Sequence, residues 1–221
     1  MKYLISFEKG EACRWLGHLD ILRTFERAIR RAELPITFST GFNPRERLAF
    51  ANALSVGVTG AAELATIELT EAVDPSRIVQ GLNEKLPPGI RMVSAVEIPE
   101  TGSRDLLNSY DRAELLVTCA CEPDTTLEAA RQAADGLLSR REIVIERERE
   151  GRKKRMDIRP LIHSIEALEH NGDRITFRMI LALGAEGTAK PAEIVGLMAE
   201  SLSGLAVRRV HRVRLIADTI S

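Results

Sequence analysis

The chain is short of the residues and runs that mark several classes of protein. Its three cysteines, Cys13, Cys119 and Cys121, are too few for a disulfide scaffold and too scattered for an iron–sulfur cluster. No stretch approaches about 18 uncharged apolar residues, and Glu8 and Lys9 interrupt the short apolar run at the N-terminus. We therefore expect a protein of the reducing cytoplasm, with no signal peptide and no membrane contact.

The chain also lacks a bulk charge of either sign. Its 31 basic and 32 acidic residues leave a net charge of −1, so overall charge favours neither nucleic acid nor a membrane as partner. Arginine nevertheless supplies 25 of the 31 basic residues. Its planar guanidinium binds carboxylates and phosphates through paired hydrogen bonds. Two interpretations stay open, selection for that geometry and nucleotide bias in the genome.

The sequence contains none of the short motifs that bind phosphates or build common catalytic centres. It has no glycine-rich phosphate loop, no dinucleotide-binding G-x-G-x-x-G and no G-x-S-x-G nucleophile turn. The four histidines have no metal-binding spacing. We interpret Cys119 and Cys121, on one side of an expected strand, as small core residues. We expect no cofactor and no metal site.

Hydrophobic residues make up 44% of the chain, which is enough for a packed core. In the first half, their spacing predicts strands at 2–8, 36–39, 63–70 and 90–98, an extended stretch after Arg47, and helices at 16–32 and 74–86. Pro35 ends the first helix, and prolines 87 and 88 end the second. The β-α-β-β-α-β order is the pattern of a ferredoxin-like fold.

The second half repeats this order with an additional strand or hairpin. Residues 99–109 have linker composition, and the pattern after them predicts strands at 110–120, 141–149, 157–169, 174–183 and 207–217 and helices at 124–139 and 190–202. We expect Asp124 or Thr125 to cap the first of these helices. The predicted fold class is α+β, with two tandem ferredoxin-like halves of antiparallel sheet at 1–98 and 110–221. The alternative is one continuous α+β sheet domain.

The helix at 16–32 has two chemically different faces. Its apolar stripe consists of Leu19, Leu22, Phe25, Ile29 and Ala32, at steps of three and four residues. Arg23, Arg27 and Arg30 step along the opposite face, with Arg14 before the helix and Arg31 at its end. We expect this arginine face to be exposed. It is either a binding surface or an ordinary solvated face.

Two further segments hold polar residues that a core does not need. The first is a loop with Gly41, Phe42, Asn43, Arg45 and Arg47, in which Gly41 permits a backbone conformation that other residues avoid. We expect His18 and Asp20 to lie beside this loop, and Arg45 and Arg47 to project to the same side where the chain is extended.

The second segment is a run of four consecutive bases, Arg152, Lys153, Lys154 and Arg155, which we expect at an exposed hairpin tip. Asp157 and Arg159 follow just inside the next strand, where we expect them to hold the tip by local pairing. Pro160 indicates an edge or irregular position. The tip is either a contact for a phosphate-rich or acidic partner or a solubilising turn.

Taken together, these segments resemble one bacterial family of unknown function. The stretch GHLDILRTFERAIRRAELPITFSTGFNPRERLAF resembles the signature half of the radical-SAM-linked proteins, and KKRMDIRPLI matches their second characteristic stretch. Glu46 and Ala65 stand where that family commonly has a proline and an aromatic or acidic residue. The resemblance implies an accessory of a cobalamin-binding-type radical SAM enzyme, with a role in RNA modification.

Three functions follow as hypotheses. The first is a non-catalytic accessory protein that binds RNA, or the partner enzyme, through the arginine-rich segments just described. The second is a metal-independent RNA-processing enzyme, in which His18 would act as general acid or base. The third is a structural adaptor whose arginines bind acidic protein surface. Salt-dependent RNA binding separates the first from the third, and RNA cleavage that disappears in His18→Ala would identify the second.

Overall fold

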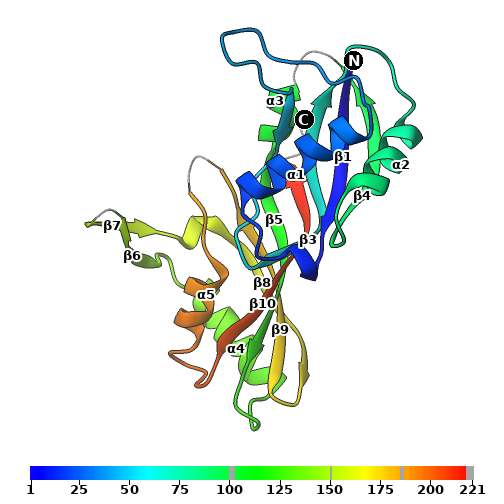
Figure 1. Ribbon diagram of the computed structural model, residues 1–221. Helices are drawn as coiled ribbons and strands as arrows, with labels where there is room; N and C mark the ends of the chain where they lie inside the picture. Colours follow the sequence, from blue (N-terminus) through cyan, green and yellow to red (C-terminus); the bar gives the residue numbers. More distant parts are fainter. Residues whose placement is uncertain (100–102, 150, 185–186, 218–221) are drawn as a thin grey trace. The chain divides into compact units, whose positions relative to one another are not determined.

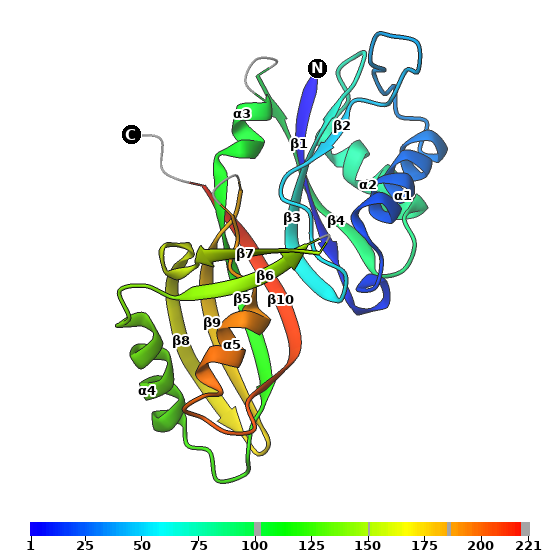
Figure 2. The same cartoon turned by 90° about the vertical axis from the view of Figure 1, so that its left-hand side faces the viewer.

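The computed structural model describes residues 1–99, 103–149, 151–184 and 187–217 (Figures 1 and 2). The fold is mixed α+β with antiparallel strand pairing, as the sequence predicts at this level. The chain divides into two compact units: Met1–Tyr110 together with the chain from Arg212 onward, and Asp111–His211. Within the described ranges, the helices are all too short or too polar to cross a bilayer.

The first unit is built on a sheet with the strand order β4-β1-β3, in which β2 also pairs with β3. All three pairings are antiparallel, and the end of β10 lies next to β3. In chain order the elements are β1 (Lys2–Lys9), a 3-10 turn (Glu11–Cys13), α1 (His18–Arg31), β2 (Leu48–Phe50), β3 (Val58–Glu68), α2 (Pro75–Lys85), β4 (Ile90–Ile98) and α3 (Ser103–Asn108).

The core of this unit lies between the sheet and the helices α1 and α2, which cover one face (Figure 2). Tyr3, Ile5 and Phe7 alternate along β1 and are buried toward that face. The ring of Phe7 meets that of Phe25 at 4.8 Å between centroids. The Tyr3 hydroxyl accepts a hydrogen bond of 2.9 Å from the backbone amide of Val73. The inward-facing residues of β1 therefore also hold α1, through Phe7, and the segment before α2, through Tyr3.

The second unit has the strand order β10-β5-β9-β8, with β9 antiparallel to both β5 and β8. Strands β6 and β7 form a separate two-stranded sheet. The elements are β5 (Tyr110–Ala120), α4 (Leu127–Leu138), β6 (Val144–Arg149), β7 (Arg152–Asp157), a 3-10 turn (Arg159–Leu161), β8 (Ile162–Asn171), β9 (Arg174–Ala182), α5 (Pro191–Met198) and β10 (Ala206–Ala217).

Three local predictions are wrong. Residues 36–39 make only isolated bridges, Ile36 with Leu69 and Phe38 with Glu46, instead of a strand. The expected linker at 99–109 contains α3, while its residues 100–102 lie outside the described part of the chain. Helix α4 is capped by Thr126, whose hydroxyl accepts from the amide of Ala129 at 3.1 Å, and not by either residue before it.

The two faces of α1 are largely as predicted. Phe25 and Ile29 are buried, and Arg23, Arg27 and Arg30 are exposed. The apolar stripe is centred on residues 21, 25, 28 and 29, so Leu22 is half-buried and Leu19 is 61% exposed. Leu19 lies in the first turn of α1, and the buried stripe of the helix begins at Ile21 instead of Leu19.

Candidate functional site

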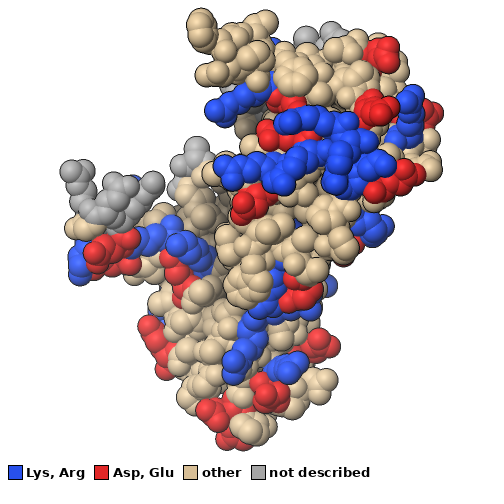
Figure 3. All heavy atoms as spheres, in the orientation of Figure 1, with Lys and Arg blue, Asp and Glu red and all other residues tan. Residues whose placement is uncertain are grey.

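The exposed side of α1 carries a hollow of about 520 Å³ that is lined by Thr24, Arg27, Arg30, Arg31 and Pro87. Figure 3 shows a band of basic side chains over the position that α1 occupies in Figure 1. Three of the five lining residues are arginines, and none of the described lining residues is acidic. The hollow therefore offers three guanidinium groups to one ligand, of which only that of Arg30 is paired with a carboxylate, Glu46.

Each of these arginines is oriented by a bond to the protein. Arg27 donates through Nε to the carbonyl of Arg23 at 3.2 Å, and Arg31 donates through Nη2 to the carbonyl of Lys85. Arg30 donates through Nε to Glu46 at 2.6 Å, and this hydrogen bond raises the pKa of Arg30. Because a guanidinium has five N–H donors, each arginine keeps donors for a ligand.

Charge reversal in Arg27→Glu is expected to cost less than about 1 kcal/mol in free energy of unfolding, because the side chain is exposed and its one bond is to its own helix. Urea denaturation of the parent and the variant measures this cost. If the variant is unfolded without urea, the arginine face of α1 is needed for the fold, and this outcome would contradict its role as a binding surface.

The loop after residue 39 is a closed excursion. Ser39 and Arg45 are joined at its base by two hydrogen bonds, from the Ser39 amide to the Arg45 carbonyl at 2.8 Å and from the Arg45 amide to the Ser39 hydroxyl at 2.9 Å. Gly41 has φ +136°, which confirms the expected need for glycine there. Phe42 and Asn43 are exposed, and the Phe42 ring is fully so.

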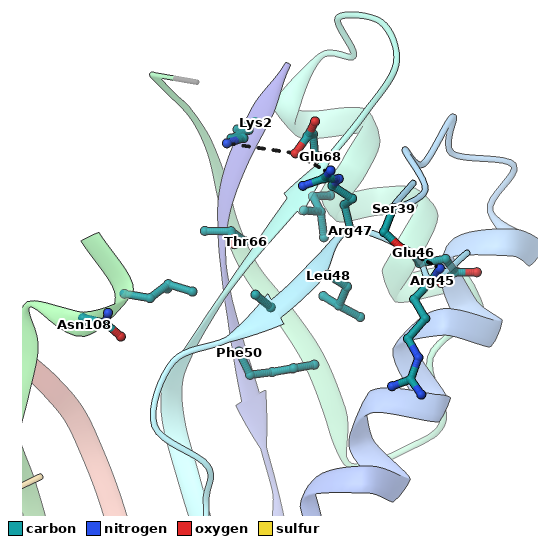
Figure 4. A pocket seen from close by; sticks show the side chains of 13 residues that line it. Lys2, Ser39, Arg45, Glu46, Arg47, Leu48, Phe50, Thr66, Glu68 and Asn108 are labelled. Atoms are coloured by element: carbon teal, nitrogen blue, oxygen red, sulfur yellow. Dashed lines mark hydrogen bonds and ion pairs between the residues drawn. The ribbon is translucent and has the colours of Figure 1, made fainter. Parts of the chain in front are cut away.

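A second, larger hollow of about 790 Å³ lies beside β2 and reaches Leu107 and Asn108 of α3 (Figure 4). Arg45 and Arg47 both line it, but Arg45 extends toward α1 while Arg47 turns toward Glu68, 3.9 Å away. The prediction that they project to one side is therefore wrong, because the chain before β2 is not regularly extended. The lining also contains Glu46 and Glu68, so the charges are mixed.

His18 and Asp20 do not contribute to the loop as expected. Glu46 bonds Arg30, so the loop meets the last turns of α1, whereas His18 and Asp20 lie in its first turn, about 18 and about 15 Å along the axis from Arg30. Asp20 caps the helix by accepting from the amide of Gly17 at 3.2 Å. The His18 ring packs edge-on against Phe50, with centroids 5.6 Å apart.

The pocket beside His18 is very small. Its volume is about 20 Å³, with Lys9, Phe50 and Glu63 among its lining residues. That space holds about one water molecule. This pocket is therefore too small to hold a nucleotide beside His18, as the general acid–base hypothesis would require.

A buried group of charged side chains near this pocket was not anticipated from the sequence. Arg212 of β10 binds both oxygens of Glu63 of β3, with Nε to Oε1 at 2.8 Å, and donates to the carbonyl of Asn52 at 2.7 Å. Lys9 is 1% exposed, and burial lowers its pKa. Lys9 donates to the carbonyls of Arg14 and Leu16, at 3.1 and 2.9 Å. The sequence offered one signal for this group: Lys9 is a charged residue in register with the buried positions 3, 5 and 7 of β1.

The basic run in the second unit forms a strand and not a tip. Lys153, Lys154 and Arg155 are exposed on β7, and the backbone of Arg152 begins that strand, although its side chain is not among the described ones. Glu146 stands opposite Arg155, and Lys153 lies 2.8 Å from Glu146. The pattern Glu-Arg-Glu on β6 supplies acidic neighbours, which reduces the basic charge available to a partner.

Asp157 and Arg159 bond to backbone groups at the base of this hairpin, instead of holding a tip by pairing with each other as expected. Asp157 accepts from the amides of Ile143 and Arg159 at 2.8 and 2.9 Å. The half-buried Arg159 side chain donates to the carbonyls of Leu138 and Ile162, both at 3.0 Å. Pro160 lies in a 3-10 turn, which confirms an irregular position there. The bonds of both side chains therefore stabilise the fold of this segment.

The cysteines are buried thiols. Cys13, Cys119 and Cys121 are free, and burial, with a smaller contribution from Cys121, raises the pKa of Cys119 to about 12. The core interpretation of Cys119 and Cys121 is confirmed. Over the described ranges, no group of three or more His, Cys, Asp or Glu side chains could hold a metal ion.

Comparison with solved structures shows a known fold at low sequence identity. A chain in the crystal structure of a Cbf5–Nop10–Gar1 complex is 11% identical, with a TM-score of 0.54, and the match covers 98% of this chain and 50% of that one. A chain of the archaeal box H/ACA sRNP Nop10–Cbf5 complex is 12% identical with a TM-score of 0.53, over 98% and 49%. The chain thus spans about half the length of these neighbours.

A third similar structure is an H/ACA RNP bound to a substrate RNA containing 2′-deoxyuridine, with 11% identity, a TM-score of 0.50 and coverage of 98% and 49%. No curated protein matches the sequence. A family model described as an uncharacterized protein conserved in bacteria (DUF2344) matches residues 2–191, which is most of the chain.

Proposed function

The chain belongs to this family of uncharacterized bacterial proteins, DUF2344, and we propose that it is a non-catalytic RNA-binding accessory protein. The ligand's phosphates would be held by the arginines of α1. Its partner would be the radical SAM enzyme that the sequence resemblance implies. The sparse, free cysteines support a cytoplasmic setting.

One observation carries the proposal: the hollow on α1 gathers Arg27, Arg30 and Arg31 without an acidic lining residue. Guanidinium groups form short, charge-assisted hydrogen bonds to phosphate oxygens. The bonds that Arg27, Arg30 and Arg31 already make restrict their rotamers, which lowers the entropy cost when a ligand binds. Several oriented guanidiniums on one helix suit a chain of phosphates better than one isolated anion.

The structural neighbours make RNA the first ligand to test. The similar chains come from a Cbf5–Nop10–Gar1 complex and from an H/ACA RNP that is bound to a substrate RNA. The similarity concerns the fold, so it supports the choice of ligand class and not the role of any residue. We further propose that both units are ferredoxin-like, a fold type whose sheets and loops bind RNA in other proteins. The orders β4-β1-β3-β2 and β10-β5-β9-β8 support this.

The proposed contacts fall into two groups. The primary group is on or near α1 and consists of Arg14, Arg23, Arg27, Arg30 and Arg31. The loop and the hairpin would add peripheral contacts through Phe42, Asn43, Arg45, Arg47, Lys153, Lys154 and Arg155. We assign Asp20, Asp157 and Arg159 supporting roles only, because their hydrogen bonds are internal to the protein.

The double variant Arg27→Gln/Arg31→Gln is expected to flatten the salt dependence of RNA binding. For a single strand, removing one arginine–phosphate interaction lowers the slope of log K against log salt by about 0.7, so removing two should lower it by about 1.4. Fluorescence anisotropy of a labelled single-stranded RNA, titrated at several salt concentrations, measures the slope. Melting temperature should change little, because both side chains are exposed.

The matched control is Arg77→Gln/Arg91→Gln, which removes the same charge from exposed positions of the same unit outside the hollow. Its slope should stay near that of the parent. Equal slopes for the two double variants would show that only net charge matters and would contradict a site on α1. No RNA binding by the parent at the lowest salt would reject the RNA proposal, and co-purification with a radical SAM enzyme would then favour the adaptor hypothesis.

A further inference from the structure

Trp15 is the single tryptophan of the chain, and it is exposed. It lies on the turn between the 3-10 segment and α1, with 66% of its surface accessible. Leu19, one turn into the helix, is 61% exposed, and Val56, next to the glycine that touches the ring, is also exposed. Because folding gains most from burying aromatic rings, an exposed tryptophan in a well-packed unit calls for a role outside the core.

The ring is held in place at its edge. A Cβ at position 57 would lie 3.2 Å from ring atom Cζ3, so the backbone at Gly57 packs directly against the indole. Gly57 has φ +84°, a conformation that favours glycine, and its amide donates to the carbonyl of Arg14 at 2.8 Å. The Arg14 guanidinium lies over the ring, 4.4 Å from its centroid. Two thirds of the Trp15 surface remains accessible beside these contacts.

The turn that carries Trp15 is fixed from inside the protein. The ammonium of Lys9 donates to the carbonyls of Arg14 and Leu16, which flank Trp15 on both sides. Lys9 is almost fully buried, and the paired Glu63 and Arg212 lie close enough to affect its pKa. Burying a cation is costly unless it is well bonded, and here the bonds immobilise one exposed aromatic residue. A ring fixed before binding gives up little entropy when a ligand stacks on it.

The charges near Trp15 favour one kind of occupant. Arg14 lies over the ring and is paired with Glu11, and beyond Leu19 the exposed side of α1 continues with Arg23 and Arg27 at steps of four residues. A ligand that covers this surface needs a flat apolar group beside a series of negative charges. Unpaired nucleotides combine the two, whereas the bases of a duplex are stacked on each other and hide their faces.

We propose that Trp15 is a stacking platform for an unpaired nucleobase, and that the chain therefore selects single-stranded over double-stranded RNA. The proposal rests on the proposed function, in which the arginines of α1 hold the phosphates. It adds the class of RNA and a residue that reads the base face.

The single tryptophan makes the test direct, because its fluorescence reports on this position alone. The full chain is titrated with single-stranded oligouridine, with an RNA duplex of the same length, and with inorganic polyphosphate. Anisotropy of a labelled probe records binding, and tryptophan emission records stacking. We expect the single strand to quench the emission, the duplex to bind more weakly with little quenching, and polyphosphate to bind without quenching.

Two substitutions at the platform and one away from it complete the design. Trp15→Ala should weaken single-strand binding about 5- to 150-fold, the range that aromatic-to-alanine changes cost per stacked base. Trp15→Phe should retain most of the affinity, because phenylalanine still offers an aromatic face. Val96→Ala, which removes an exposed apolar side chain of β4 outside this surface, should stay within about twofold of the parent. Affinity for polyphosphate should be the same in all four proteins.

The outcomes separate this proposal from the function on which it rests. If RNA binds with the expected salt slope, but emission is unchanged and Trp15→Ala binds like the parent, the platform is rejected and the arginine site stands. If Trp15→Ala loses polyphosphate and RNA equally, Trp15 only supports the fold and the platform is again rejected. If no RNA binds at any salt, both proposals fail. If Trp15→Ala does not fold, the parent and Trp15→Phe still test the platform. Quenching of the parent by the single strand and retained affinity in Trp15→Phe support it, and absence of quenching rejects it.

Discussion

Replacement of Phe25 by alanine is expected to lower the free energy of unfolding of the first unit by about 3–5 kcal/mol. Phe25 is completely buried, and its ring meets those of Phe7 and Phe50 edge-on, at 4.8 and 5.5 Å between centroids. Phe7 and Phe50 also contact each other at 5.7 Å. Removing the central ring thus leaves a cavity among three elements, α1, β1 and β2.

Urea denaturation followed by far-UV circular dichroism measures this loss. Leu19→Ala is the control, because Leu19 lies on the same helix but is mostly exposed, and its change should stay within about 0.5 kcal/mol. A loss below about 1 kcal/mol in Phe25→Ala would mean that the aromatic cluster is not the centre of the core. The arginine face of α1 depends on that core, since the cluster fixes the rotation of the helix.

A loss of similar size, about 3–5 kcal/mol, is expected for Arg212→Met, because it leaves the Glu63 carboxylate buried without its partner. In the parent, the two side chains are only 4% and 6% exposed, and Arg212 binds both carboxylate oxygens. The carbonyl of Asn52 would also lose its bond from Arg212. Measurement is again by urea denaturation, with the free energy extrapolated to water.

The double variant Glu63→Gln/Arg212→Met completes a thermodynamic cycle. It should be less destabilised than the sum of the two single variants, because removing both charges avoids a buried uncompensated ion. Additive losses would show that the two groups do not interact in solution. The result also bears on Trp15, since the buried pair lies beside the ammonium of Lys9 that clamps the tryptophan's turn.

The sequence alone determined most of the helices and strands. The alternation along residues 2–8 and the three- and four-residue steps of α1 are local properties of the chain, and burial of one face follows from them. For the same reason, the exposure of Arg23, Arg27 and Arg30 and the need for glycine at position 41 could be predicted. The absence of catalytic and metal-binding motifs could likewise be recognised without a structure.

The tertiary structure decided which charged residues serve the fold and which face solvent. Arg212 and Glu63 are 149 positions apart, and only the placement of the end of β10 beside β3 joins them. The loop at Glu46 joins Arg30 instead of His18, because a rigid helix separates its two ends. The position of Trp15 depends on bonds to its turn, two of them local, from Lys9, and one long-range, from the amide of Gly57 to the carbonyl of Arg14. The periodicity of apolar residues indicates which face of a helix or strand is buried, because it depends only on residues of that element. An ion pair or a bonded turn depends on which residues meet in the folded chain, and the sequence does not show these partners.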